Sequence, residues 1–170
     1  MSTAYDLTEL CKLAYKYGSD KCPQLNHNYT PFYYQLLKNR KKTIRKVLEL
    51  GIGYHTNMGH VERQQGTYLQ GASLYMWREF FPNAQIYGAD ILPETIFEDE
   101  RIKTYLCDET KKEDLTKLIE ATGSDIDLFI DDGSHHLKDQ VFTCQTLIPL
   151  LKKDVIYVIE DVAHSRALVR

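Results

Sequence analysis

From about residue 45 onward, short apolar runs alternate with segments whose apolar residues recur at helical spacing. The apolar runs predict five strands, at residues 47–50, 85–90, 102–107, 126–130 and 155–159. Segments with one apolar side, at residues 74–81, 115–119 and 141–151, predict helices between several of these strands. This alternation is typical of a largely parallel sheet covered by helices on both faces, so we expect a doubly wound α/β fold.

The first 44 residues predict helices only. Asp6 and Glu9, three residues apart, form a variant of the capping box at the start of one helix. Thr30 followed by Pro31 predicts the start of a second helix, with Thr30 as its N-cap, because proline is favoured at the first helical position. We therefore expect a single domain over residues 1–170, with a helical segment at 1–44 and the strand-containing core at 45–170.

Composition and charge narrow the classes of function. A net charge of −3 gives no overall attraction for nucleic acid or an anionic membrane. No apolar stretch approaches the roughly 20 residues of a membrane helix, and the N-terminus lacks the charged and apolar regions of a signal peptide. The four cysteines lack C-x-x-C spacing, which favours a reducing compartment. We expect a cytoplasmic protein that binds neither nucleic acid nor membranes.

The end of the first predicted strand indicates a ligand site, because ligands of open α/β sheets bind at the carboxyl ends of the strands. Gly51-Ile52-Gly53 follows this strand and allows a ligand to approach the backbone closely; the alternative is a tight turn without a ligand. The third glycine of a dinucleotide fingerprint is missing, and no G-x-x-x-x-G-K-[ST] phosphate loop is present. The sequence thus disfavours NAD and nucleotide triphosphates.

S-adenosylmethionine fits this pattern better, since it carries no phosphate. Asp90, after the second strand, can accept from both ribose hydroxyls, and Asp108, after the third, from the adenine amino group. Glu49 can reach the methionine amino group, and Ser73, near a helix N-terminus, the methionine carboxylate. Taken singly, Asp90 and Asp108 are equally well explained as surface acids in turns. Their placement at successive strand ends favours a cofactor site.

Acidic residues also follow the fourth and fifth predicted strands. Asp132 and the Glu160-Asp161 pair would face each other across neighbouring strands, which lie about 4.8 Å apart. Three carboxylates so close repel one another unless a cation lies between them or one is protonated, and oxygen ligands favour Mg²⁺, Mn²⁺ or Ca²⁺ over zinc. Both Glu160 and Asp161 can be ligands only if the chain turns there. Alternatively, Asp131 or Asp132 caps the following helix.

Two histidines follow Asp132 closely. A histidine that titrates near neutral pH is a natural base for a hydroxyl proton, and we favour His135 over His136, which is open to a supporting or surface role. The aromatic residues at 29–34 belong either to the core or to an acceptor pocket. The long segment at residues 54–70 forms either a lid or part of that pocket.

A series of short motifs is spread in order over most of the chain. They are KYGSDK at 16–21, NYTPFY at 28–33, ELGIG at 49–53, GASLYMWR at 71–78, FPNA at 81–84, GADI at 88–91, DDGSHH at 131–136 and VIED at 158–161. Together they resemble the class I S-adenosylmethionine-dependent methyltransferases that modify sugars on macrolide and related antibiotics, of the mycinamicin and rhamnosyl type. The resemblance implies a Rossmann-like sheet.

The same resemblance implies roles for individual residues. It implies that Mg²⁺ (or Mn²⁺) is held by Asp132, Glu160 and Asp161, and that His135 is the catalytic base. Cofactor contacts are expected at Thr30, Glu49, Gly51, Gly53, Ser73, Asp90 and Asp108. We therefore expect metal-dependent O-methylation of a hydroxyl on a sugar or a glycosylated small molecule.

The sequence departs from this family after the fifth predicted strand. Such methyltransferases usually continue through a sixth and a seventh strand, whereas this sequence stops at Arg170. We expect a sheet that lacks the final two strands, with an edge that invites pairing with another chain, as in a homo-oligomer. Two alternatives are another metal-dependent enzyme, of hydroxylase type, on the same scaffold, and a truncated cofactor-binding module without catalysis.

Overall fold

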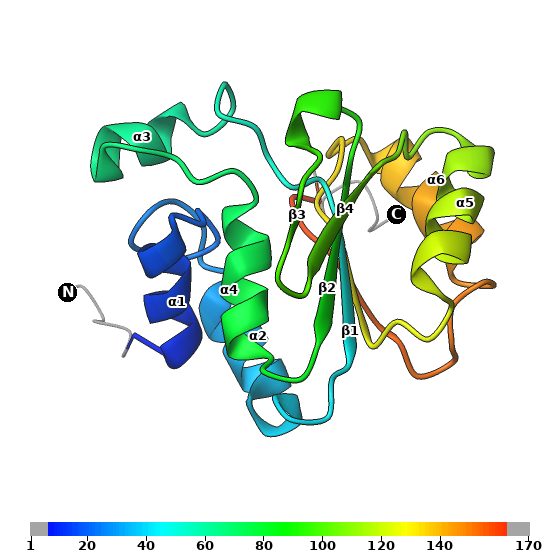
Figure 1. Ribbon diagram of the computed structural model, residues 1–170, viewed down its shortest axis with the longest axis horizontal. Helices are drawn as coiled ribbons and strands as arrows, with labels where there is room; N and C mark the ends of the chain where they lie inside the picture. Colours follow the sequence, from blue (N-terminus) through cyan, green and yellow to red (C-terminus); the bar gives the residue numbers. More distant parts are fainter. Residues whose placement is uncertain (1–6, 163–170) are drawn as a thin grey trace, which may run out of the picture.

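The computed structural model describes residues 7–162 and contains one six-stranded sheet, in the order β3-β4-β2-β1-β5-β6 (Figure 1). All neighbouring strands are parallel except β3 and β4. The strands are β1 (Lys46–Leu50), β2 (Gln85–Asp90), β3 (Glu98–Asp99), β4 (Ile102–Leu106), β5 (Leu128–Asp131) and β6 (Ile156–Ile159). The predicted doubly wound, largely parallel sheet is confirmed.

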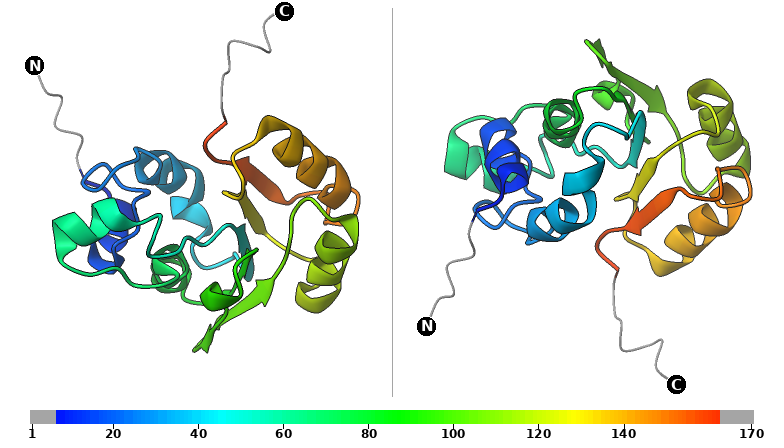
Figure 2. Two further views of the ribbon diagram at one scale, coloured as in Figure 1. Left: turned by 90° about the horizontal axis from the view of Figure 1, so that it is seen from above. Right: turned by 90° about the horizontal axis from the view of Figure 1, so that it is seen from below.

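Helices cover both faces of this sheet. They are α1 (Glu9–Tyr17), α2 (Thr30–Leu37), η1 (Lys38–Arg40), α3 (Gly59–Gln65), α4 (Ala72–Phe80), η2 (Pro93–Thr95), α5 (Lys112–Thr122) and α6 (Leu137–Leu147). Figures 1 and 2 show α1, α2 and α4 on one side of the sheet and α5 and α6 on the other. The amphipathic segments predicted between the strands are the helices α4, α5 and α6.

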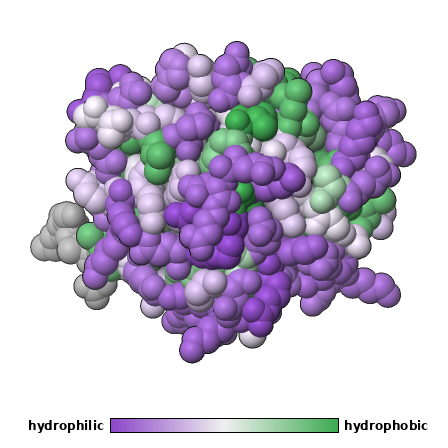
Figure 3. All heavy atoms as spheres, in the orientation of Figure 1, coloured by the Kyte–Doolittle hydropathy of each residue, from purple (hydrophilic) through white to green (hydrophobic). Residues whose placement is uncertain are grey.

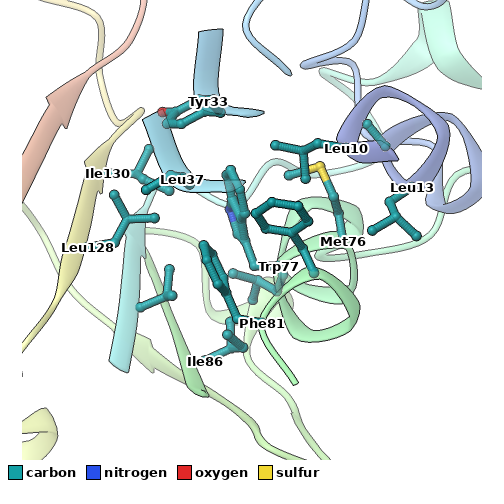
Figure 4. Packing of buried hydrophobic residues seen from close by; sticks show 14 of the residues in the cluster. Leu10, Leu13, Tyr33, Leu37, Met76, Trp77, Phe81, Ile86, Leu128 and Ile130 are labelled. Atoms are coloured by element: carbon teal, nitrogen blue, oxygen red, sulfur yellow. The ribbon is translucent and has the colours of Figure 1, made fainter. Parts of the chain in front are cut away.

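The hydrophobic core is divided by the sheet into two clusters. Along β1, Val47 belongs to the cluster beneath α1, α2 and α4, whereas Leu48 and Leu50 belong to the cluster beneath α5 and α6. This alternation follows from the two-residue period of a strand. Trp77 of α4 lies at the centre of the first cluster (Figure 4). Glu49 therefore points toward the Trp77 side of the sheet.

Helix starts differ in detail from the sequence prediction. Thr8 is the N-cap of α1 and accepts a hydrogen bond from the backbone N–H of Cys11, whereas Asp6 lies outside the described residues. Thr30 is the first residue of α2, and Tyr29 precedes it without a side-chain cap. The N-cap of α6 is His136, so neither Asp131 nor Asp132 caps this helix.

The elements that were not predicted are the short helices η1 and η2, the strand β3 and the helix α3. β3 contains two exposed residues and forms an antiparallel edge with β4. The helix α3 lies within the long segment at 54–70, and Val61 is its buried residue. This segment therefore contains regular structure and packs on the core through Val61, with the partly buried Met58 and Tyr68 against the same cluster.

β6 is the last strand of the sheet among residues 7–162 and pairs there with β5 alone. The described helices include none that combines the length and the apolar character needed to cross a membrane. The face shown in Figure 3 is largely hydrophilic, with hydrophobic residues gathered near its top.

Candidate cofactor and metal site

A pocket of about 510 Å³ opens at the carboxyl ends of the parallel strands, where the sequence predicted a ligand site. Its volume lies within the range of small-molecule sites. The predicted site residues that line it are Glu49, Gly51, Gly53, Ser73, Asp90, Asp108, Asp132, His135, Glu160 and Asp161. The structure does not bring Thr30 to the pocket. Thr30 is fully buried, and its hydroxyl donates to Sγ of Cys11 at 3.1 Å.

The glycine turn after β1 packs directly on the residues that follow β5. Gly51 has a φ of +80°, and a Cβ atom there would lie 2.0 Å from the carbonyl oxygen of Asp132. The backbone N–H of Asp132 in turn donates to the carbonyl of Leu50 at 2.8 Å. The turn therefore needs glycine, both for its left-handed conformation and for this close approach.

Asp90 is fixed at the pocket wall by the backbone. Its Oδ2 accepts from the N–H of Ile52 and its Oδ1 from the N–H of Leu92, both at 3.0 Å. Each carboxylate oxygen has a second lone pair, so both remain able to accept from a diol. Ile91 and Leu92 line the same pocket and add apolar surface. This arrangement suits a ribose next to an aromatic base.

Asp108 lies on the same side of the pocket, after β4. The hydroxyl of Thr110 donates to its Oδ1 at 2.6 Å, and this bond, with Lys111 at 3.1 Å, holds the pKa of Asp108 below its ordinary value. Asp108 is therefore an ionised acceptor at neutral pH.

Glu49 is a buried carboxylate at the base of the pocket, with 1% of its surface exposed. Burial raises its pKa, whereas the ammonium of Lys21 and hydrogen bonds from Ser73 and Trp77 lower it. Nε1 of Trp77 donates to Oε2 at 2.6 Å, and Nζ of Lys21 lies 3.4 Å from Oε1. These donors orient Glu49 between the core and the pocket.

Lys21 provides a cation within the acidic cluster. Its Nζ lies 2.6 Å from Oδ2 of Asp132 and 2.5 Å from Oε2 of Glu160. Burial alone would lower the pKa of Lys21, but the three neighbouring carboxylates hold it well above its ordinary value. The sequence indicated that a cation or a proton must separate these acids, yet the lysine was not assigned that role.

His135 lies between the two aspartates of the predicted metal site. Its Nε2 is 3.1 Å from Oδ1 of Asp132, and its Nδ1 is 3.5 Å from Oδ2 of Asp161. The hydrogen bond to Asp132 raises the pKa of His135, against the effect of burial. One ligand atom from each of these three residues lies within 4.8 Å of the others, which is close enough to surround one metal ion.

The chain turns after β6, as required if Glu160 and Asp161 are to enter the same pocket. Asp161 has a φ of +48°, and both acids line the cavity. Glu160 is 4% exposed; Tyr33 donates to its Oε1 at 2.5 Å, and burial raises its pKa to about 7. Tyr29 donates a hydrogen bond to Asp161. Tyr33 is thus a core residue, and Tyr29 lies at the pocket.

Asp131 points away from this pocket, because successive strand residues face opposite sides. It is fully buried, and burial together with the nearby Glu109 raises its pKa to about 7. Glu109 does line the pocket, and its carboxylate accepts from the N–H of Ser134 at 2.5 Å. His136 is exposed. Of the two aspartates and two histidines at 131–136, Asp132 and His135 are the ones that line the cavity.

Comparison with known proteins gives close matches over most of the chain, although no family model matches it. It is 34% identical over 160 residues to the 8-demethyl-8-alpha-L-rhamnosyl tetracenomycin-C 2'-O-methyltransferase of Streptomyces olivaceus, across 94% of this chain and 39% of the relative. It is 33% identical over 153 residues to the mycinamicin VI 2''-O-methyltransferase of Micromonospora griseorubida, across 90% of this chain and 36% of the relative.

A solved structure agrees with these relatives. The MycE methyltransferase of the mycinamycin pathway, in complex with Mg, S-adenosylhomocysteine and mycinamycin VI, superposes with a TM-score of 0.76 at 31% identity. The alignment covers 92% of this chain and 40% of that chain. The chain is a relative of the sugar O-methyltransferases. Its resemblance to this group is confirmed, and it spans less than half the length of the methyltransferases it matches.

Proposed function

We propose that this chain binds S-adenosylmethionine and a divalent cation, Mg²⁺ or Mn²⁺, and transfers the methyl group to a hydroxyl of a sugar on a small-molecule acceptor. One observation carries the proposal: Asp90 and Asp108 share a single pocket with Asp132, His135 and Asp161. The names of the relatives, and the Mg and S-adenosylhomocysteine of the MycE complex, support it.

The residues present fit a hard divalent cation. Asp132 and Asp161 offer carboxylate oxygens to one small volume beside His135, and Glu160 lies next to Asp132. We assign Asp132, Glu160 and Asp161 as the ligands, since oxygen donors suit Mg²⁺ and Mn²⁺. When bound, the cation would lower the pKa of an acceptor hydroxyl and fix its orientation.

The cofactor is assigned to the β1, β2 and β4 side of the pocket. Asp90 would bind the ribose hydroxyls, and Asp108 the adenine amino group. Glu49 and Ser73 would hold the methionine end, beside the left-handed turn at Gly51 and Gly53, which also lines the pocket. Thr30 is left out of this set because it is buried at the start of α2, where its hydroxyl donates to Sγ of Cys11.

His135 is assigned as the base. Its side chain is 44% exposed and is oriented by Asp132 and Asp161, one on each ring nitrogen. It would take the proton of the acceptor hydroxyl as the oxygen forms a bond to the methyl carbon and the carbon–sulfur bond breaks. The products are a methyl ether and S-adenosylhomocysteine, with the proton on His135.

The test is methyl transfer to rhamnosylated acceptors, with Mg²⁺ and with EDTA, alongside calorimetry with S-adenosylhomocysteine. We expect His135→Gln to lower kcat by roughly 10²–10⁴-fold. Asp132→Asn should abolish metal-dependent turnover, and both variants should bind S-adenosylhomocysteine as the wild type does. Unchanged turnover by Asp132→Asn in EDTA would refute the mechanism. Cofactor binding without transfer to any sugar would favour a non-catalytic module, and failure to bind the cofactor would favour another metal-dependent enzyme.

The remaining proposals concern the protein as a whole. We propose that residues 1–170 form one domain, supported by a hydrophobic cluster that unites α1 and α2 with α4 and the sheet. We also propose a cytoplasmic enzyme that does not act on nucleic acid and that forms a homo-oligomer. Light scattering of the purified chain tests the last point, since a strict monomer would contradict it.

A further inference from the structure

Lys21 is the one basic side chain among residues 7–162 whose ammonium lies within 4.0 Å of three carboxylates. Nζ approaches Asp132 at 2.6 Å, Glu160 at 2.5 Å and Glu49 at 3.4 Å, and 3% of the side chain is exposed. Two of these acids belong to the proposed metal site, and Glu49 belongs to the proposed cofactor site. The ammonium therefore lies where the two halves of the pocket meet.

The backbone fixes this lysine from the N-terminal helical segment. Lys21 lies in the connection between α1 and α2, and its carbonyl accepts from the N–H groups of Tyr29 and Thr30 at 3.1 and 3.0 Å. The start of α2 thus holds the residue in place, and its side chain extends from the helical layer into the sheet site.

We infer that Lys21 is a positioning residue that serves as a resident cation, holding Asp132, Glu160 and Glu49 in their working geometry whether or not a divalent cation is bound. The inference rests on the proposed function for the roles of these acids. It adds to the proposed site a residue from outside the strand ends, Lys21, whose ammonium offsets part of the charge of the acidic cluster.

The charges in the cluster support this role. The buried Glu49 and Glu160 and the partly buried Asp132 surround one ammonium, so Lys21 offsets part of the negative charge that these acids bring together. Buried carboxylates are stable when paired, and removing one partner of a buried pair is strongly destabilising because the other charge is left uncompensated.

Lys21 is not suited to act as a ligand or a base. A protonated lysine has three donors and no acceptor; here Nζ donates to Asp132 and Glu160 and forms an ion pair with Glu49 at 3.4 Å. It would therefore neighbour the metal through shared carboxylates and would not bind it. Because it acts through Asp132 and Glu160, its loss should change how the site responds to metal.

The experiment compares the thermal unfolding of the full chain in EDTA and in saturating Mn²⁺. In EDTA we expect Lys21→Met to lower Tm by on the order of 10 °C. Lys21→Arg should keep most of the stability, because it keeps the charge. The double variant Lys21→Met/Glu160→Gln should recover a large part of the loss, because it removes an uncompensated carboxylate together with its partner.

The response to Mn²⁺ separates positioning from simple packing. Mn²⁺ should raise the Tm of Lys21→Met by more than it raises that of the wild type, since a cation then replaces the missing charge. A residue that only filled space would cause the same loss in EDTA and in Mn²⁺. Lys12→Met, at an exposed lysine of α1, is the matched control and should leave both Tm values unchanged.

Each outcome of the unfolding experiment either supports or overturns the role inferred for Lys21. A wild-type Tm for Lys21→Met in EDTA, or a Mn²⁺ response equal to that of the wild type, overturns the inference. If Lys21→Met does not fold, Lys21→Arg and the double variant carry the test, and a double variant that also fails overturns it. Calorimetry that shows no Mn²⁺ binding by the wild type refutes the metal part of the proposed function. In that case the Tm values of the wild type and Lys21→Met in EDTA still test the role of Lys21.

Discussion

The contact between Gly51 and Asp132 yields a quantitative prediction for Gly51→Ala. A left-handed conformation costs a non-glycine residue roughly 1–2 kcal/mol. The new Cβ would also lie 2.0 Å from the carbonyl oxygen of Asp132, so the backbone after β5 must move. Overpacking of this kind typically costs about 1–3 kcal/mol more. We therefore expect Gly51→Ala to lower the free energy of unfolding by about 2–5 kcal/mol.

Gly66 offers a matched control for this variant. It has a φ of +79° at the end of α3, almost the same as Gly51, but an added Cβ would meet nothing within 4 Å. Gly66→Ala should therefore show the conformational cost alone, about 1–2 kcal/mol. Urea denaturation measures both variants, and Mn²⁺ titration should show weaker binding for Gly51→Ala only. If the two variants are equally stable, the proposed contact does not constrain the turn.

Three further predictions concern other parts of the structure. Asp127 accepts from the backbone N–H of Lys46 at 3.0 Å and from Lys152, and these bonds outweigh burial to hold the pKa of Asp127 below its ordinary value. At neutral pH, Asp127→Asn should lower stability by roughly 1.5–3 kcal/mol, the usual contribution of a hydrogen bond to a charged group. Because the pKa of Asp127 is depressed in the folded state, the extra stability of the wild type should be complete above the ordinary aspartate pKa. It should disappear as the pH falls through the folded-state pKa. Urea denaturation measures this difference, and a difference that persists in acid would contradict the prediction. Trp77→Phe removes the donor to the buried Glu49 and should cost about 1–3 kcal/mol in thermal or urea unfolding, whereas a neutral effect would show that this hydrogen bond is dispensable. Asp90→Asn should weaken S-adenosylhomocysteine binding in calorimetry without changing Mn²⁺ affinity, and equal loss of both would argue against separate half-sites.

The parallel sheet and most of the pocket could be predicted because their signals are strong and local. Buried strands read as apolar runs, and the acid or glycine after each run must lie at the same edge of the sheet. This reasoning placed Asp90, Asp132 and His135 in one cavity, where the structure has them. It also made a turn at this point the condition for both Glu160 and Asp161 to be ligands, and Asp161 has a φ of +48°.

The features that were missed have weak or non-local signals. α3 buries Val61 alone, so it shows no helical period, and β3 is two exposed residues held by its pairing with β4. The position of Thr30 depends on how α2 packs on α1, which no local pattern reveals. Lysine is almost never fully buried unless it is paired, so a sequence provides no reason to place Lys21 inside the protein until its partners are located.

The pairing of Lys21 with Glu160 has a consequence for how the protein forms. The two residues are 139 positions apart in the chain, so their contact closes a loop that contains nearly all of the described residues. During synthesis the N-terminal helices leave the ribosome long before β6, and until β6 follows, Lys21 has only Glu49 and Asp132 of its three carboxylate partners. Contacts of such long range form late and slow the folding of a domain. The pocket proposed for cofactor and metal is therefore completed by β6, the last of the described strands to be synthesised. A nascent chain arrested before residue 156 would lack Glu160, and with it part of the acidic cluster around Lys21.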